Sequence, residues 1–237
     1  MSWQFEAIGR VESPYKEKFA IPRQPGLAAH AKGRVVLLPP YDVADAVRGL
    51  EGFSHIWLSF IFHATAEQGW RPTVRPPKLG GNARVGVFAT RSTFRPNPIG
   101  LSVVRLLGVD IRKGVALEIE GMDLLDGTPI IDIKPYLPFV DSQPGASMGF
   151  APEPVAFLQV MFHPQAEPAL QAASCRYPDL VGLIRDVLAQ DPRPGYADDP
   201  ERVYGMQLYD LNIRWRCVAG VAEVLAVEQT QARLGGE

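Results

Sequence analysis

Residues 86–102, GVFATRSTFRPNPIGLS, place two arginines and a rigid turn inside an otherwise apolar stretch. Arg91 and Arg95 have little reason to lie in an ordinary core strand, and the two prolines of Pro96-Asn97-Pro98 have no amide hydrogen to donate to a neighbouring strand. The apolar pattern resumes directly afterwards. We therefore expect two strands, Val85 to Thr90 and Leu101 to Leu107, joined by a polar segment of fixed conformation.

Similar short apolar segments, each bounded by Gly or Pro, lie on both sides of this stretch. The one helix expected in this part spans Asp42 to Leu50, with Asp42 as its N-cap and Gly52 as its stop. Seven strands with one helix exclude a doubly wound α/β sheet, and a closed β-barrel is the simplest way to remove strand edges. The other five expected strands are Phe5 to Val11, Arg34 to Leu38, His55 to Phe62, Val115 to Ile119 and Ile130 to Ile133.

The pattern changes after Asp141 to Pro154, DSQPGASMGFAPEP, which has the composition of a linker. Beyond it we expect a small α+β domain. The sequence thus predicts a barrel domain over residues 1–145 and a second domain over 155–237. The second contains a strand at Val155 to Phe162, helices at Gln165 to Ala173 and Asp179 to Ala189, and a final pair of strands at Tyr204 to Arg216 and Gly220 to Val227.

The composition is that of a globular protein, because 46% of the 237 residues are hydrophobic and 21% are charged. No apolar run approaches the roughly 18 to 20 residues of a membrane span, and the first residues carry charge where a signal peptide is apolar. We therefore expect a cytoplasmic protein. Cys175 and Cys217 lack a CxxC pattern and are interpreted as reduced structural residues.

Charge is divided unevenly along the chain. Residues 1–100 hold 13 Lys and Arg against 7 Asp and Glu, whereas residues 101–237 hold 11 against 19. Between Gln68 and Val109 there are seven basic residues and no acidic one. Such a stretch produces a positive field that attracts polyanions.

The sequence lacks the motifs of several common nucleotide-binding sites and catalytic sites. Neither GxGxxG after a strand nor GxxxxGK[ST] occurs, and there is no GxSxG or Cys/His pairing for acyl transfer. His55 and His63 share a strand face but would lie roughly 26 Å apart on a straight strand. They cannot hold one metal ion together, and we expect no metal site.

Polar residues instead gather where strands end, as in many binding sites. The loop from Pro14 to Leu27 contains Lys16, Lys18, Arg23 and Gln24. The segment DLLDGTPIIDIKPYLPF, residues 123–139, places carboxylates before an apolar strand and Lys134-Pro135-Tyr136 after it.

Five stretches together resemble the TsaA-like family, the tRNA (adenine-37)-N6-methyltransferases also called TrmO. They are SPYKEKFAIPRQPGL, FSHIWLSFIFH, GWRPTVRPPKLGGNARVGVFATRSTFRPNPIGLS, DLLDGTPIIDIKPYLPF and AQDPRPGY, and the resemblance covers nearly the whole chain. It implies a β-barrel methyltransferase that uses S-adenosylmethionine, and a homodimer with its active site near the subunit contact. It further implies methylation of N6 on threonylcarbamoyladenosine beside the anticodon.

Matching motif positions gives the residues that the resemblance assigns to the cofactor. Among them an arginine suits the cofactor's carboxylate, Asp126 could accept from its ribose hydroxyls or ammonium, and Leu101 could pack against the adenine. For a base that takes the N6 proton, Asp126, His63 and Tyr136 remain open. The full cofactor set is Pro22, Arg23, Gln24, His63, Ala64, Arg91, Leu101, Asp126, Gly127, Thr128 and Pro129.

The anticodon loop is single-stranded, so its adenine can be turned into a pocket at low cost. Trp70 or Tyr15 could stack on bases. Asp191, Arg193 and Tyr196 could complete the partner subunit's site, grip the anticodon stem or form a rigid linker. The expected phosphate contacts are Lys16, Lys18, Arg71, Arg75, Lys78, Arg84 and Arg95, with Arg193 as a further RNA contact.

Two other function classes remain open on the residues alone. A non-enzymatic RNA-binding barrel would need only the basic stretch, and the Asp126 cluster would then be a turn. A methyltransferase acting on a small molecule is the second alternative. Titration with S-adenosylmethionine distinguishes a methyltransferase from the non-enzymatic RNA-binding barrel. Methylation of tRNA with and without threonylcarbamoyl distinguishes a tRNA methyltransferase from one that acts on a small molecule.

Overall fold

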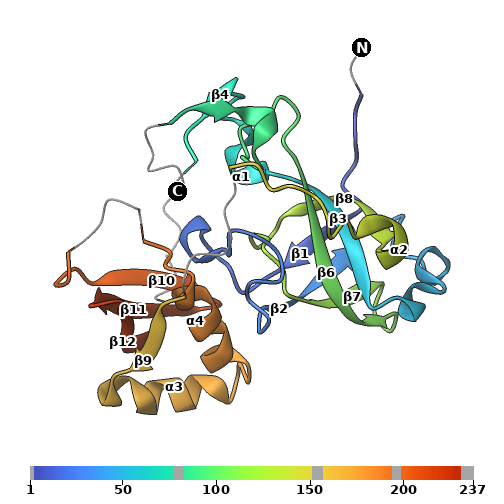
Figure 1. The fold of residues 1–237 in the computed structure, drawn as a ribbon. Helices are drawn as coiled ribbons and strands as arrows, with labels where there is room; N and C mark the ends of the chain where they lie inside the picture. The colour runs from blue at the N-terminus through green and yellow to red at the C-terminus, as the bar shows by residue number, and fades with distance from the viewer. Residues whose placement is uncertain (1–2, 77–82, 151–156, 194–198, 231–237) are drawn as a thin grey trace, which may run out of the picture.

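The computed structural model describes residues 3–76, 83–150, 157–193 and 199–230. Six antiparallel strands form a closed barrel in the order β1, β2, β7, β6, β3, β8 (Figure 1). Pairing of β1 with β8 closes the sheet, which confirms the expected barrel. The strands are β1 (Gly9–Glu12), β2 (Lys32–Leu37), β3 (His55–Ile61), β6 (Ile99–Asp110), β7 (Ala116–Glu120) and β8 (Pro129–Pro135).

Side chains alternate across the barrel wall with the two-residue period of a strand. On β3 the inward residues Ile56, Leu58 and Phe60 are buried. On β6 the residues with the same burial are Gly100, Ser102, Val104 and Leu106, so a serine occupies an inward position among apolar residues. Leu101 and Leu107 of β6 are exposed on the outer surface.

The segment expected as a helix from Asp42 to Leu50 is instead two short 3-10 helices, η2 (Ala44–Val47) and η3 (Leu50–Gly52). Val43, not Asp42, precedes η2 and makes no side-chain cap. Gly49 between the two helices has a φ of 86°, a left-handed conformation that ends a helix. The prediction of one continuous helix was therefore wrong.

The strand expected from Val85 to Thr90 is also wrong beyond its first two residues. It forms β5 (Val85–Gly86), which pairs with β4 (Thr73–Val74) outside the barrel, and then the 3-10 helix η5 (Val87–Ala89). The carbonyl of Val87 accepts from the Thr90 hydroxyl and from Arg95, at 2.9 and 3.3 Å. In a β-strand, the Val87 carbonyl would accept a hydrogen bond from a neighbouring strand. Here it accepts from Thr90 and Arg95 instead.

Three further short helices lie next to the barrel strands. They are η1 (Lys18–Ala20) after β1, α1 (His63–Ala66) after β3, and α2 (Pro138–Asp141) after β8. In Figure 1, α1 and β4 lie at the same end of the molecule, above the barrel.

The C-terminal region is a four-stranded sheet in the order β10, β11, β12, β9, with two helices packed on it, as Figure 1 shows. The stretch expected as one strand from Tyr204 to Arg216 is a hairpin, because Tyr209 turns the chain with a φ of 53°. The elements are β9 (Gln159–Phe162), η6 (Pro164–Ala166), α3 (Glu167–Ser174), α4 (Leu180–Ala189), β10 (Tyr204–Leu208), β11 (Leu211–Val218) and β12 (Val221–Gln229).

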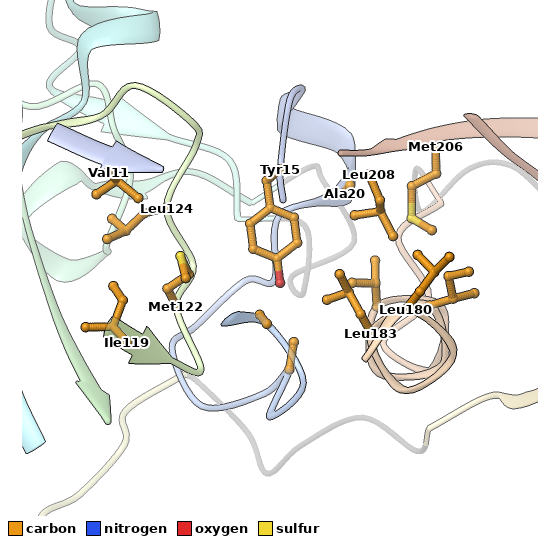
Figure 2. Packing of buried hydrophobic residues seen from close by; sticks show 14 of the residues in the cluster. Val11, Tyr15, Ala20, Ile119, Met122, Leu124, Leu180, Leu183, Met206 and Leu208 are labelled. Carbon is orange, nitrogen blue, oxygen red and sulfur yellow. The ribbon is translucent and has the colours of Figure 1, made fainter. Parts of the chain in front are cut away.

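Tyr15 joins the two regions. Its side chain is fully buried, and Figure 2 shows the ring between Met122 and Leu124 on one side and Leu183 and Leu208 on the other. A buried tyrosine cannot stack on an RNA base, so this role is excluded for Tyr15. The division into domains at 145 and 155 stays a prediction, since buried residues of both regions belong to one cluster.

Other features of the described residues bear on function class. No helix within them has the length and apolar character to span a membrane. No three His, Cys, Asp or Glu side chains among them come together as metal ligands. Cys175 is exposed, Cys217 is buried, and both are free thiols.

Candidate cofactor and RNA site

A cavity of about 660 Å³ opens where the end of β3 and the start of β6 meet three loops. Its walls come from residues 18, 21–25, 57, 60–65, 90, 91, 93, 95, 99–103, 123–125 and 128. A volume of this size suits a ligand as large as a nucleoside derivative. The loops lie far apart in the sequence, and closure of the sheet brings them together.

Eight of the eleven residues expected at the cofactor line this cavity. Arg91 donates to the side-chain oxygen of Gln24, which links the loop before β6 to the loop after β1. Leu101 is 55% exposed and offers an apolar surface at the cavity wall. The eight are Pro22, Arg23, Gln24, His63, Ala64, Arg91, Leu101 and Thr128.

Asp126, Gly127 and Pro129 are not among the described residues that line the cavity. Both carboxylate oxygens of Asp126 are engaged: Oδ1 accepts from the Ser13 amide at 2.9 Å, and Oδ2 pairs with Lys16 at 2.6 Å. The structure therefore gives Asp126 a role in holding the loop after β1. A contact between Asp126 and a cofactor stays a prediction.

The three base candidates are separated by the fold. His63 begins α1 and lines the cavity. Tyr136 packs against His55 and Trp57, with ring centroids 6.3 and 5.8 Å apart, and is not among the lining residues. Asp126 is paired with Lys16, as described.

Asp123, to which the motifs assigned no role, lines the cavity with Ser102. Ser102 is 2% exposed, and its hydroxyl donates to Asp123 Oδ1 at 2.7 Å. Burial raises the pKa of the Asp123 carboxyl, while the bond from Ser102, a backbone hydrogen bond and the charge of Arg91 act in the opposite direction. A serine at an inward position of an apolar strand was the one signal that could have found this pair.

Exposed arginines surround the β4–β5 pair beside the cavity. We call Arg71, Arg75 and Arg84 the basic surface; all three are exposed. The Arg71 amide donates to the carbonyl of Phe94 at 3.2 Å, and its guanidinium lies 4.4 Å from the centre of the Phe94 ring. These contacts connect the basic surface to the loop that lines the cavity. Trp70 is 56% exposed next to it, and Lys78 lies outside the described residues.

Arg95, Lys16 and Lys18, also expected at RNA phosphates, are engaged within the protein. Arg95 donates to the Thr90 carbonyl at 2.8 Å and lines the cavity. Lys18 donates to the Ala64 carbonyl at 2.9 Å. Arg95 thus holds the turn between β5 and β6 in place, and an RNA contact by these three residues stays a prediction.

Arg193 and Asp191 lie at the contact between the C-terminal region and the site. Arg193 Nε is 2.7 Å from Asp191 Oδ1, and its hydrogen bonds hold the pKa of Asp191 below the ordinary value. The Asp191 carbonyl accepts from Arg23 at 3.4 Å, so this loop contacts the cavity loop of its own chain. Tyr196 lies outside the described residues.

The sequence matches two family models, the tRNA-methyltransferase O N-terminal domain over residues 10–142 and the TrmO C-terminal domain over residues 155–230. An Escherichia coli K12 protein named tRNA (adenine(37)-N6)-methyltransferase is 57% identical over 96% of this chain and 98% of its own length. A Pseudomonas aeruginosa relative, named as an S-adenosylmethionine-dependent methyltransferase, is 48% identical over 91% of this chain and 93% of its own.

Solved structures resemble the whole fold. A crystal structure titled TrmO superposes with a TM-score of 0.81 at 43% identity, covering 96% of this chain and all of the other. A crystal structure of TrmO from Pseudomonas aeruginosa gives a TM-score of 0.82 at 41% identity, covering 96% and 98%.

Proposed function

The chain belongs to the tRNA-methyltransferase O family, and from that premise we propose that it methylates N6 of adenosine 37 in tRNA with S-adenosylmethionine as methyl donor. The finer part of the proposal is that the adenosine carries an N6-threonylcarbamoyl group. The observation that supports it best is one cavity lined by most of the expected cofactor residues, next to a basic surface.

The residues of the cavity fit S-adenosylmethionine chemically. When bound, S-adenosylmethionine supplies an electrophilic methyl group on a sulfonium. Arg23 and Arg91 offer guanidinium groups, whose planar fork binds a carboxylate through two parallel bonds. Leu101 offers an apolar surface to an adenine ring.

The protein contributes to such a reaction chiefly by positioning, because a nucleophile held about 3 to 3.5 Å from the methyl carbon reacts far faster than one that must be found by diffusion. The rigid Pro96-Asn97-Pro98 turn and the bonds of Arg95 hold the loop of Arg91 in one conformation. Little conformational entropy is then lost when the site is filled.

A methylation assay tests the function and its finer part together. The purified protein is incubated with S-adenosylmethionine and tRNA from cells that make or lack the threonylcarbamoyl group, and nucleosides are analysed by mass spectrometry. We expect N6-methylation of adenosine 37 on the modified tRNA alone. Equal methylation of both tRNAs would contradict the threonylcarbamoyl requirement, and methylation of neither would contradict the proposed function.

Arg91→Ala is expected to weaken binding of S-adenosylmethionine about 10- to 100-fold, since loss of one charge-assisted hydrogen bond costs about 1.5–3 kcal/mol. Calorimetric titration measures the dissociation constant. Arg105→Ala is the matched control, because Arg105 lies on β6 and pairs with Glu120 at 2.9 Å, outside the residues lining the cavity. Unchanged affinity in Arg91→Ala would remove Arg91 from the cofactor site.

The homodimer and the cytoplasmic location stay predictions. The exposed side chain of Leu107 on the outer surface of β6 supports a contact between copies of the chain. Light scattering at several protein concentrations would measure the oligomeric state.

A further inference from the structure

Asp123 is a buried carboxylate in the cavity that the cofactor assignment leaves without a role. It lies just before Leu124 and Leu125, which line the same cavity, and faces Ser102 on the neighbouring wall. Ion pairing does not explain its presence, because no cation among the described residues forms a salt bridge with it. Burying an unpaired carboxylate costs free energy. Buried ionisable groups of this kind are common at functional sites, where they take part in the reaction.

The side chains of the described residues engage only one oxygen of this carboxylate. Ser102 donates to Oδ1, and no other side chain in the described part of the chain donates to Asp123. Ser102 is itself buried on β6, so its hydroxyl fixes the rotation of the carboxyl group. Asp126 differs in this respect, since its two oxygens are taken by Ser13 and Lys16.

We infer that Asp123 is the group that accepts the N6 proton of the adenosine during methyl transfer, and that Ser102 positions it. The inference rests on the proposed function. The carbonyl of a threonylcarbamoyl group withdraws electrons from N6, which makes the proton more acidic and the nitrogen a poor nucleophile. A carboxylate beside N6 therefore has a proton to accept and improves the nucleophile by accepting it.

The step balances in atoms and electrons. N6 forms a bond to the methyl carbon, the carbon–sulfur bond breaks with its electron pair remaining on sulfur, and the N6 proton moves to Asp123 Oδ2. The carboxyl group is then neutral, and it returns to the carboxylate by releasing the proton to solvent. No metal ion or redox partner is required for this balance.

Burial makes Asp123 a better base than an exposed aspartate, because it raises the pKa of the carboxyl. The charges around Asp123 also influence the pH above which its carboxyl group is ionised and can accept a proton. The charged and titratable groups around it are Arg91 and Tyr15, with Lys18, Arg23, His63 and Arg95 along the same cavity.

The test compares Asp123→Asn with the wild-type protein on tRNA carrying threonylcarbamoyladenosine, in single-turnover reactions across a range of pH. Asparagine keeps the shape and can still accept from Ser102, but it cannot take a proton. We expect the rate to fall roughly 10²- to 10⁴-fold. Calorimetric affinity for S-adenosylmethionine is expected to stay at the wild-type value. The control Asp45→Asn changes an exposed carboxylate paired with Arg48 and is expected to leave the rate unchanged.

The pH dependence of the rate in Ser102→Ala provides a second test. A residue with only a structural role would not change this pH dependence. The wild-type rate is expected to fall as pH drops through the pKa of Asp123, because the protonated acid cannot act as a base. The bond from Ser102 favours the ionised form and lowers the pKa of Asp123, so its loss should move this limb of the profile to higher pH. In Asp123→Asn the limb should be absent.

Three results would overturn the inference. They are a full rate in Asp123→Asn, a retained acidic limb in that variant, or a loss of S-adenosylmethionine affinity that accounts for the whole loss of rate. Thermal melting and the calorimetric titration show that each variant is folded. If the wild-type protein binds S-adenosylmethionine but methylates no tRNA, the proposed function is contradicted. If the wild-type protein is active and Asp123→Asn keeps the full rate, only the role of Asp123 is contradicted.

Discussion

We expect Tyr15→Ala to lower the free energy of unfolding by about 3–5 kcal/mol, which is the range for truncating a buried aromatic side chain. Tyr15 is 0% exposed, and its ring fills the space between the barrel and the C-terminal sheet (Figure 2). Its backbone forms a bridge with Leu208 of β10. The truncation would therefore leave a cavity at the junction of the two regions. Urea unfolding followed by circular dichroism measures the change.

Tyr15→Phe is the matched control for this cavity. The Tyr15 hydroxyl is buried and makes no hydrogen bond to any described residue. Its removal should change the free energy of unfolding by less than about 1 kcal/mol, because no bond between described residues is lost. If Phe and Ala at position 15 destabilise the protein equally, packing of the ring is not what joins the regions.

The triple variant Arg71→Ala, Arg75→Ala and Arg84→Ala is expected to weaken tRNA binding roughly 10- to 100-fold near physiological salt. Each arginine that neutralises a phosphate releases counterions when it binds. The slope of log affinity against log salt should therefore shrink by about 0.7 to 0.9 for each charge removed. Fluorescence anisotropy with labelled tRNA at several salt concentrations measures both the affinity and the slope.

The control for this variant removes three arginines that are already paired with carboxylates. Arg48, Arg112 and Arg214 pair with Asp45, Asp110 and Glu228. Replacing them changes the net charge by the same amount, so a similar loss of affinity would mean that total charge matters and the basic surface does not. A salt slope unaffected by the first triple variant would also contradict a phosphate contact there.

The barrel was predictable because strand formation leaves a local pattern. Alternation in β3 and β6 and the Gly and Pro residues between strands gave the positions of most barrel strands within a few residues. One strand prediction failed where side chains bond to the backbone. The Val85–Thr90 segment has the composition of a strand, but Thr90 and Arg95 take the carbonyl of Val87. Sequence patterns do not show which carbonyl a distant guanidinium will reach.

The motifs predicted a set of residues at the cofactor, and eight of the eleven line one cavity. The placement of Asp126 and Asp123 was not predictable in the same way. They precede β8 by three and six positions, yet Lys16 pairs with Asp126 and Ser102 bonds to Asp123. Loop conformation alone decides which carboxylate faces the cavity.

The order of residues thus sufficed for the barrel, the basic stretch and the family, because periodicity, charge and motifs are properties of neighbouring positions. It did not suffice for the burial of Tyr15, the pairing of Asp126 or the bond between Ser102 and Asp123. These depend on contacts between segments far apart in the chain. Such contacts exist only after the sheet closes and the C-terminal region packs against it.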